Sequence, residues 1–389
     1  MIQIIRTARQ PMTPSNRYDL HELAGAFGDL GTLIPFVVAY VSLLKMDPGG
    51  ILLPFGIALI AVGLINRTPF PVQPMKAVGA AAITQTVGVV TLTPAIVAGA
   101  TLATGLFWLA LAATGLAKRM SQWIPKPALL GVIMGLGFSF MLEGIRMMAQ
   151  HWVLAAALLA LTFVVMARTR VPAMVLLLLA GATAALVDQP TLAHELAAIR
   201  PALRFPDFAW QSLGWKDIWL GALLLALPQL PLTFGNALIA ITEENNRLFP
   251  DRPVNERRVA FSTAAMNLGS SLLGGIPMCH GAGGLAGHVK FGARTGGASV
   301  MLGVILTVTA LFFAESVGTL FRLFPPAVLG VILFLAGAEL ARGSRDPGGE
   351  KEDRFVVLAT AAFAVLNVGV AVVFGFLAHH AARRGWLRV

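Results

Sequence analysis

The feature that most constrains this chain is a series of long hydrophobic runs separated by short polar loops. Runs of this kind lie at residues 51–65, 95–117, 151–167, 171–187 and 299–314. Only 12% of the 389 residues are charged, whereas roughly 25% are charged in an average soluble protein, so the chain lacks the polar surface that water requires. Because helices satisfy their own backbone hydrogen bonds in lipid, we predict an all-α polytopic membrane protein.

The hydropathy pattern predicts fourteen transmembrane segments, several of them short or broken. The segments lie near 20–44, 51–65, 74–90, 94–117, 127–142, 151–167, 171–187, 215–242, 257–273, 278–289, 298–315, 325–341, 355–366 and 368–382.

The basic residues predict the topology of these segments. When the loops are assigned alternately to two sides, 22 of the 29 lysines and arginines lie on the side of both termini and six on the other. By the positive-inside rule, both termini are expected in the cytoplasm of a bacterial-type inner membrane. The net charge of +10 is therefore a topology signal, and we expect no nucleic-acid partner. Residues 1–18 have no apolar core of a signal peptide and are expected to form a cytoplasmic tail.

Three short strings recur in the same order in the two halves of the chain. PALLGVI at 127–133 returns as PAVLGVI at 326–332, PMK at 74–76 returns as PMC at 277–279, and FGDLGTLI at 27–34 is loosely echoed by FGNALIAI at 234–241.

The recurrence predicts two repeats of seven segments, at 19–187 and 215–382. An extracytoplasmic linker at 188–214 is expected to join them, and a cytoplasmic tail at 383–389 to follow. Because seven is odd, the second repeat enters the membrane in the opposite sense. This arrangement is typical of secondary transporters, whose binding sites lie between broken helices.

The third and tenth segments carry matched interruptions. Prolines crowd the start of the third at 69–74, which predicts extended chain followed by a half-helix from Met75. In the tenth, Pro277 is followed by a glycine series. Two half-helices from opposite sides would point their positive N-terminal ends at one another, with Lys76 at one start. Neither start holds an acidic residue, so the pattern favours an anion site; the alternative is helix breaks for close packing, with Lys76 reaching an interface.

Acidic residues inside the segments are functional candidates because a buried charge is costly in a membrane. Asp29 is the first candidate for coupling to protons or another cation, with pairing to Lys76 or Arg67 as the alternative. Thr233 and Asn236 occupy the corresponding part of the eighth segment. Four glutamates are expected outside the site, as interface or gate residues (Glu143, Glu339) or in solvent (Glu243, Glu244).

No enzyme, cofactor or metal motif is recognisable in the sequence. Cys279, His280 and His288 could in principle form a metal site, but they have neither a tight spacing motif nor a carboxylate beside them. The single cysteine also excludes a disulfide within the chain.

Four stretches resemble the signature segments of the molybdate transporter family. The members of this family are short relatives of the sulfate permease superfamily. The four stretches are ELAGAFGDLGTLIPFVVAY, PFPVQPMKAVGAAAI, GNALIAITEENNRLFPD and MNLGSSLLGGIPMCHGAGGLAGHVKFGARTGGAS. The resemblance implies core and gate domains and molybdate import together with protons. It also implies a substrate site formed by Gln73, Pro74, Met75, Lys76, Cys279, His280, Gly281, Ala282 and Gly283, flanked by Asp29, Thr32 and Asn236.

Other functions remain open at this point. A sulfate transporter or an uncoupled anion channel would use the same scaffold, and a nucleobase permease would need a carboxylate in the eighth or tenth segment. The last hydrophobic segment ends shortly before Val389, so we expect no regulatory STAS domain, and this expectation favours the molybdate branch. The expected partners are the oxyanion, protons or another coupling cation, and membrane lipid, and a homodimer is common in the superfamily.

Overall fold

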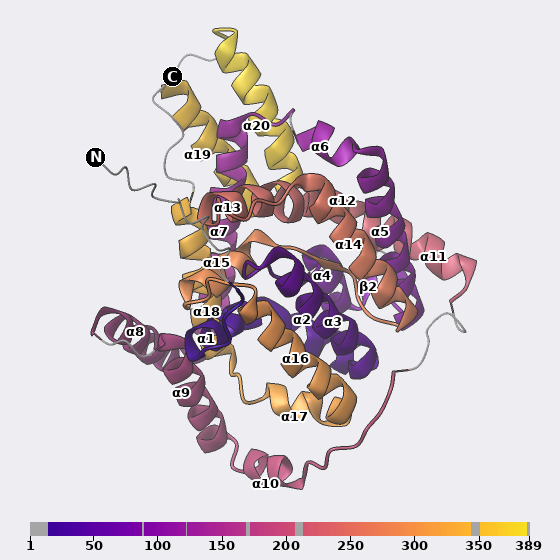
Figure 1. Ribbon diagram of the computed structural model, residues 1–389, viewed down its shortest axis with the longest axis vertical. Coiled ribbons are helices and arrows are strands. Elements are labelled where there is room, and N and C mark those ends of the chain that lie inside the picture. The colour runs from indigo at the N-terminus through magenta and orange to yellow at the C-terminus, as the bar shows by residue number, and fades with distance from the viewer. Residues whose placement is uncertain are drawn as a thin grey trace, which may run out of the picture.

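The computed structural model describes residues 15–87, 89–121, 123–168, 172–206, 213–343 and 351–386. These residues are mostly helical (Figure 1). The elements up to residue 198 are α1 (Leu20–Ala26), η1 (Phe27–Asp29), α2 (Leu30–Ser42), α3 (Pro48–Asn66), β1 (Gln73–Pro74), α4 (Lys76–Thr84), β2 (Thr86–Val87), β3 (Val90–Thr91), α5 (Pro94–Thr114), α6 (Leu116–Ser121), α7 (Lys126–Met148), η2 (Ala149–His151), α8 (Trp152–Arg168), α9 (Ala173–Asp188) and α10 (Thr191–Ala198).

The second half again contains a nine-residue helix, α15, in the place that α4 has in the first half. Its elements are α11 (Trp215–Gly221), η4 (Ala222–Ala226), α12 (Leu227–Phe234), η5 (Gly235–Ala240), α13 (Ile241–Leu248), α14 (Glu256–Leu272), β4 (Met278–Cys279), α15 (Ala282–Lys290), α16 (Gly297–Phe312), η6 (Ala314–Ser316), α17 (Val317–Phe321), α18 (Pro326–Gly343), α19 (Lys351–Leu366) and α20 (Val368–Arg383).

Every predicted hydrophobic segment contains a helix, but the number that spans a membrane is smaller by length and composition. Five helices or continuous helical stretches within the described residues are long and apolar enough to cross, or up to seven if each bent pair is counted as one span. Fourteen membrane-spanning segments therefore remain a prediction. The linker at 188–214 contains α10, which the hydropathy pattern did not predict.

The eighth segment is one long helical stretch with two π-helical turns, η4 and η5. Each widened turn lies close to Pro228 or Pro231, which lack the N–H group that a regular helix needs. Single π-turns occur frequently at functional sites, and η5 carries Asn236.

The longest helices surround the two nine-residue helices, α4 and α15. α3 packs against α16, α5 against α14, and α7 against α18, while α4 and α15 lie near the centre of Figure 1. Where α7 crosses α18, a Cβ on Gly137 would meet the carbonyl oxygen of Gly337 at 2.6 Å, so only glycine permits this approach. Gly337 meets Gly137 in the same way, and each glycine belongs to a helix that begins with one copy of the repeated string.

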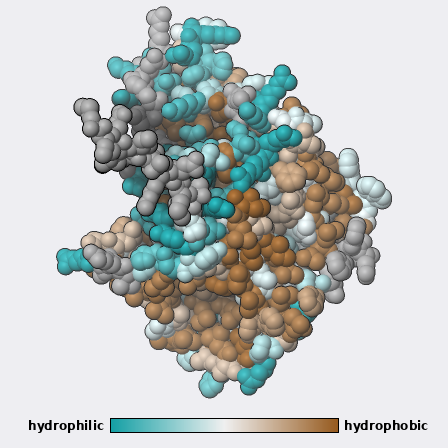
Figure 2. Space-filling view, in the orientation of Figure 1, coloured by the Kyte–Doolittle hydropathy of each residue, from teal (hydrophilic) through white to brown (hydrophobic). Residues whose placement is uncertain are grey.

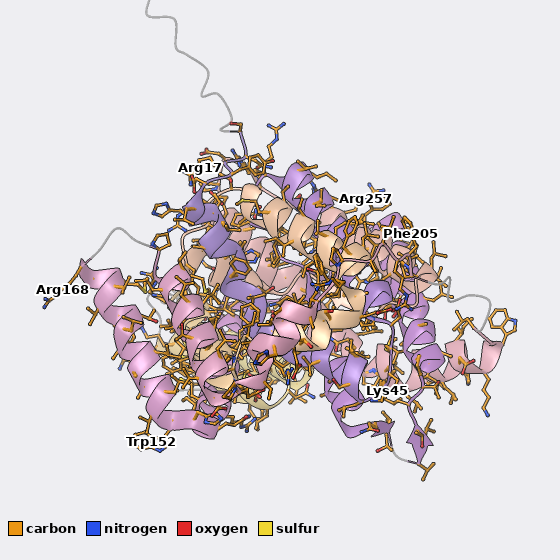
Figure 3. The ribbon with its side chains drawn as sticks, turned by 90° about the horizontal axis from the view of Figure 1, so that it is seen from below. Arg17, Lys45, Trp152, Arg168, Phe205 and Arg257 are labelled. Carbon is orange, nitrogen blue, oxygen red and sulfur yellow. The ribbon has the colours of Figure 1, made fainter. Side chains whose placement is uncertain are left out.

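The surface has the polarity expected of a membrane protein. Figure 2 shows hydrophobic residues over the centre and lower right of this face, with hydrophilic residues gathered at its top and left. In the perpendicular view, Arg17 and Arg257 lie at the upper edge, and Lys45 and Trp152 lie at the lower edge (Figure 3). The assignment of the loops to the two sides of the membrane remains a prediction from the sequence.

Candidate functional site

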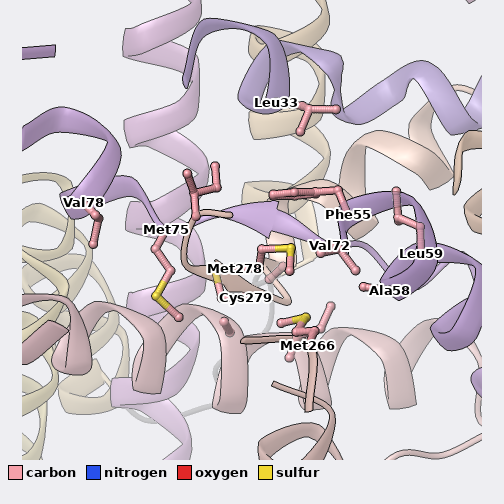
Figure 4. Close-up of a cluster of buried hydrophobic side chains, with 14 of the residues drawn as sticks. Leu33, Phe55, Ala58, Leu59, Val72, Met75, Val78, Met266, Met278 and Cys279 are labelled. Atoms are coloured by element: carbon pink, nitrogen blue, oxygen red, sulfur yellow. The ribbon is translucent and has the colours of Figure 1, made fainter. Parts of the chain in front are cut away.

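The two interrupted segments meet through a pair of two-residue strands. β1 and β4 are antiparallel, with Gln73 opposite Cys279. The backbone N–H of Met75 then donates to the carbonyl oxygen of Pro277 over 2.9 Å. Figure 4 shows this pair within a buried cluster that includes Met75, Met278 and Cys279. The pairing places the starts of the nine-residue helices α4 and α15 beside each other.

A buried asparagine of α14 completes the hydrogen bonding of β4. Asn267 donates from Nδ2 to the carbonyl oxygen of Met278 over 2.7 Å, and its Oδ1 accepts from the N–H of Met278 over 2.9 Å. Its side chain therefore replaces a neighbouring strand, which a two-residue strand in a protein interior needs. Asn267 was not among the residues predicted from the sequence, although an asparagine in a helix interior is an available signal.

Two histidines hold the extended, proline-rich chain before α4. His280 Nδ1 lies 2.8 Å from the carbonyl oxygen of Pro71, and its Nε2 lies 2.9 Å from Oγ of Ser262. His288 Nδ1 lies 2.9 Å from the carbonyl oxygen of Pro69. Because both ring nitrogens of His280 have protein partners, its geometry supports a structural role better than direct contact with a substrate.

Asp29, which the sequence predicts to lie inside a membrane segment, is buried beside β1. It is 4% exposed, and its Oδ1 accepts hydrogen bonds from Oγ1 of Thr32 and Nε2 of Gln73. Gln73 Nε2 also lies 2.9 Å from Thr32 Oγ1. Among the described residues, the hydrogen-bond partners of the Asp29 carboxylate are Thr32 and Gln73, and Lys76 interacts with it electrostatically without a direct salt bridge.

The amide of Gln73 connects Asp29 to the start of α15. Its Oε1 is buried without a hydrogen-bond partner among the described residues. A Cβ at Gly281 would overlap Oε1 and lie 3.2 Å from Nδ2 of Asn236, so both amides face the backbone of Gly281. A side chain at this position would therefore displace the Gln73 amide.

Side-chain amides cap both short helices, which modifies the expected anion site. Gln229 Oε1 accepts from the N–H of Ala77 over 2.7 Å, and Asn236 Oδ1 accepts from the N–H of Ala282 over 3.2 Å. Two of the N–H groups expected to face an anion therefore already have partners, because a buried helix start needs caps. Gln229, which also donates to Thr233 over 2.9 Å, was missed in the sequence.

Lys76 is covered by an aromatic ring from α7. Its Nζ lies 3.1 Å from the centroid of the Phe140 ring, within the range of a cation–π interaction. A Cβ at Gly283 would overlap the same ring. The Phe140 side chain is 3% exposed, and its ring contacts the starts of both short helices. No motif in the sequence pointed to this phenylalanine.

A cavity of about 1050 Å³ opens between α2, α7, α9, α17 and α18. Glu143, one helical turn after Phe140, lines it together with Ile34, Met147, Asp188, Arg322 and Leu329.

The remaining glutamates divide differently from the prediction. Glu339 of α18 faces Lys290 of α15 at 3.8 Å, which agrees with an interface position. Glu244 is 3% exposed and bonded to Arg247, so its predicted solvent exposure is wrong. The arginine three residues further along the helix stabilises this buried carboxylate.

Comparison with known proteins gives a consistent family. The model of a family described as "Molybdate transporter of MFS superfamily" matches residues 21–140 and 221–340. Molybdate transporter 2 of Arabidopsis thaliana is 31% identical over 403 residues, covering 91% of this chain and 85% of that protein. Molybdate transporter 1 of the same plant is 29% identical over 407 residues, covering 93% and 87%.

Solved structures of anion transporters share the fold. The transmembrane domain of the cyanobacterial bicarbonate transporter BicA aligns with a TM-score of 0.55 at 17% identity, over 91% of this chain and 97% of that one. Murine Slc26a9, an anion transporter solved in an inward-facing state, aligns with a TM-score of 0.60 at 12% identity, over 97% and 70%. At these identities the likeness concerns the fold alone.

Proposed function

This chain belongs to the molybdate transporter family, and from that premise we propose that it imports molybdate by secondary active transport coupled to protons. Membership of the family and the anion-transporter fold support transport of an anion across a membrane. The finer proposal concerns where the oxyanion binds and how a proton accompanies it.

The observation that carries the proposal is the pairing of β1 with β4. It brings the ammonium group of Lys76 and the positive end of α15 to one buried place, and neither helix start contains an acidic residue. A cation and oriented helix dipoles stabilise a dianion strongly where water is excluded. The proposed substrate-binding residues are Thr32, Gln73, Pro74, Met75, Lys76, Asn236, Cys279, Gly281, Ala282 and Gly283, with His280 holding the backbone of Pro71.

Asp29 is the proposed coupling residue. It shares Gln73 with the anion site, and its Oδ2 would lie 2.7 Å from a Cβ placed on Gly284 in the first turn of α15. An ionised carboxylate there repels a dianion, whereas a protonated one does not. Proton and anion therefore bind best together, which makes the proton gradient a driving force for import.

The test is uptake of labelled molybdate into proteoliposomes with and without a pH gradient. We expect accumulation that the gradient increases, and weaker competition by sulfate, a tetrahedral dianion that differs mainly in size. Lys76→Gln should lower uptake at least tenfold, because a hydrogen bond to a charged group contributes about 1.5–3 kcal/mol. Lys45→Gln is the matched control, since Lys45 is exposed.

Two results would contradict the proposal. Robust sulfate uptake without molybdate uptake would assign the protein a different substrate. Equal loss of uptake in the Lys76 and Lys45 variants would show that Lys76 has no special role at the site.

A further inference from the structure

The amide group of Gln73 lies between Asp29 and the start of α15, and its two ends have different surroundings. Nε2 donates to Oδ1 of Asp29 and to Oγ1 of Thr32. Oε1 is buried and has no hydrogen-bond partner within the described part of the chain. This oxygen faces the backbone of Gly281, where the proposed anion site begins.

This orientation of the amide is unfavourable for an anion. A carbonyl oxygen presents negative partial charge, and a buried polar atom without a partner is costly. The orientation follows from Asp29, because an ionised carboxylate only accepts hydrogen bonds and therefore holds the Nε2 donor of Gln73. Oε1 is left on the side of the anion.

Protonation of Asp29 reverses this preference. A protonated carboxyl group has an O–H donor, for which the carbonyl oxygen of Gln73 is the matching acceptor. A half-turn of the amide about its last side-chain bond then pairs Oε1 with Asp29 and points Nε2 at the site. The proton stays on Asp29 in this step, and the anion gains a hydrogen-bond donor in place of an acceptor.

We propose that the Gln73 amide is a switch that couples protonation of Asp29 to anion binding. The inference rests on the proposed function, because it concerns how that site links its two substrates. It goes beyond simple charge repulsion by Asp29, since the amide itself must change orientation. Gln73 thereby contacts the anion directly only in the protonated state.

The neighbouring charged and titratable groups do not supply this coupling. Lys76 of α4 and Cys279 of β4 are the groups whose electrostatic interaction reaches Asp29. The ammonium of Lys76 attracts the anion whether or not Asp29 carries a proton. Asn236 of η5 is neutral at every relevant pH, and its Oδ1 already caps α15.

A double-mutant cycle on the full-length protein separates the switch from repulsion. The measurement is the equilibrium dissociation constant of molybdate for the purified protein in lipid nanodiscs, at constant ionic strength and across about pH 6 to 8. The four proteins are the unchanged chain, Asp29→Asn, Gln73→Leu and the double variant. Gln73→Met, which keeps the length of the side chain, is the second replacement if the leucine variant does not give a folded, monodisperse protein.

The switch predicts a specific pattern of affinities. The unchanged protein should bind molybdate more tightly as the pH falls, by up to tenfold per pH unit for one linked proton. Asp29→Asn should bind tightly at all these pH values, because its amide donates to Oε1 as a protonated Asp29 would. Gln73→Leu should weaken binding about tenfold or more at low pH, since the donor is lost. In the Gln73→Leu background, Asp29→Asn should tighten binding by a clearly smaller factor than in the unchanged chain, because only the charge repulsion remains to be removed.

The opposite pattern overturns the inference. If Asp29→Asn tightens molybdate binding by the same factor in the unchanged chain and in the Gln73→Leu variant, charge repulsion alone links proton and anion, while the proposed function stands. Absence of molybdate binding by the unchanged protein at every pH would instead contradict the proposed function, and the switch with it.

Discussion

At the scale of single residues, the site is a chain of polar contacts in an otherwise apolar interior. Asp29, Gln73 and Asn236 come from three different segments, and each is at most 4% exposed. Asp29 accepts a hydrogen bond from the Gln73 amide, whose Oε1 faces the backbone at Gly281 without a partner among the described residues, and Asn236 accepts from the N–H of Ala282. Buried polar networks of this kind are sensitive to every member, because a lost partner leaves a polar atom unsatisfied.

A substitution at Asp29 distinguishes a coupled carrier from an anion channel. Asp29→Asn keeps the size of the side chain but cannot take up a proton, so accumulation of molybdate driven by a pH gradient should be lost while downhill exchange persists. Counterflow and gradient-driven uptake in the same proteoliposomes measure the two activities. Accumulation that persists at the unchanged rate would place the coupling elsewhere; Asp188→Asn, which changes an exposed carboxylate of the cavity lining, is the control.

At the scale of elements, the important relation is between α7 and the two short helices. α4 and α15 are joined through the β1–β4 pair, and α7 contributes the ring of Phe140 to their starts. A cation–π contact is worth ~0.5–2 kcal/mol, which an anion can replace. We therefore expect a bound anion to compete with the Phe140 ring for Lys76.

Removal of this ring should favour the anion. In Phe140→Leu the side chain stays apolar and bulky but has no aromatic face, so molybdate no longer competes with a ring for Lys76. Its dissociation constant should fall by about two- to thirtyfold. Phe138→Leu, on the same helix but 42% exposed, should change affinity less than twofold. The dissociation constants of both variants can be measured by isothermal titration with molybdate. Unchanged affinity in Phe140→Leu would show that the ring does not compete with the anion for Lys76.

At the scale of the whole molecule, several observations point to two related halves. The matched stretches of the family model begin at residues 21 and 221, and the recurring strings have a similar spacing. α7 meets α18 at Gly137 and Gly337, and β1 meets β4 in antiparallel register. Contacts between equivalent elements are expected at the axis that relates inverted repeats.

An inverted repeat with seven segments in each half predicts that both termini lie on one side of the membrane. Fusion of green fluorescent protein to the C-terminus should give fluorescent cells, and fusion of alkaline phosphatase at the same point should give no activity, because that enzyme needs the extracytoplasmic side. A phosphatase fusion within the linker at 188–214 should be active. Phosphatase activity at the C-terminus would exclude an even number of spans with a cytoplasmic N-terminus.

The sequence by itself determined the class of protein, the helical segments, the family and the two interruptions at which we propose the site. These features follow from local signals in the sequence. The hydropathy of a segment indicates whether it can lie in lipid, and proline and glycine change the conformation of the backbone at their own positions. Only the tertiary structure decided that Asp29 pairs with Gln73, that His280 holds Pro71, that Gln229 caps α4 and that Phe140 covers Lys76. Each of those contacts joins residues from different segments, and their geometry depends on how the helices pack, which hydropathy and spacing do not encode.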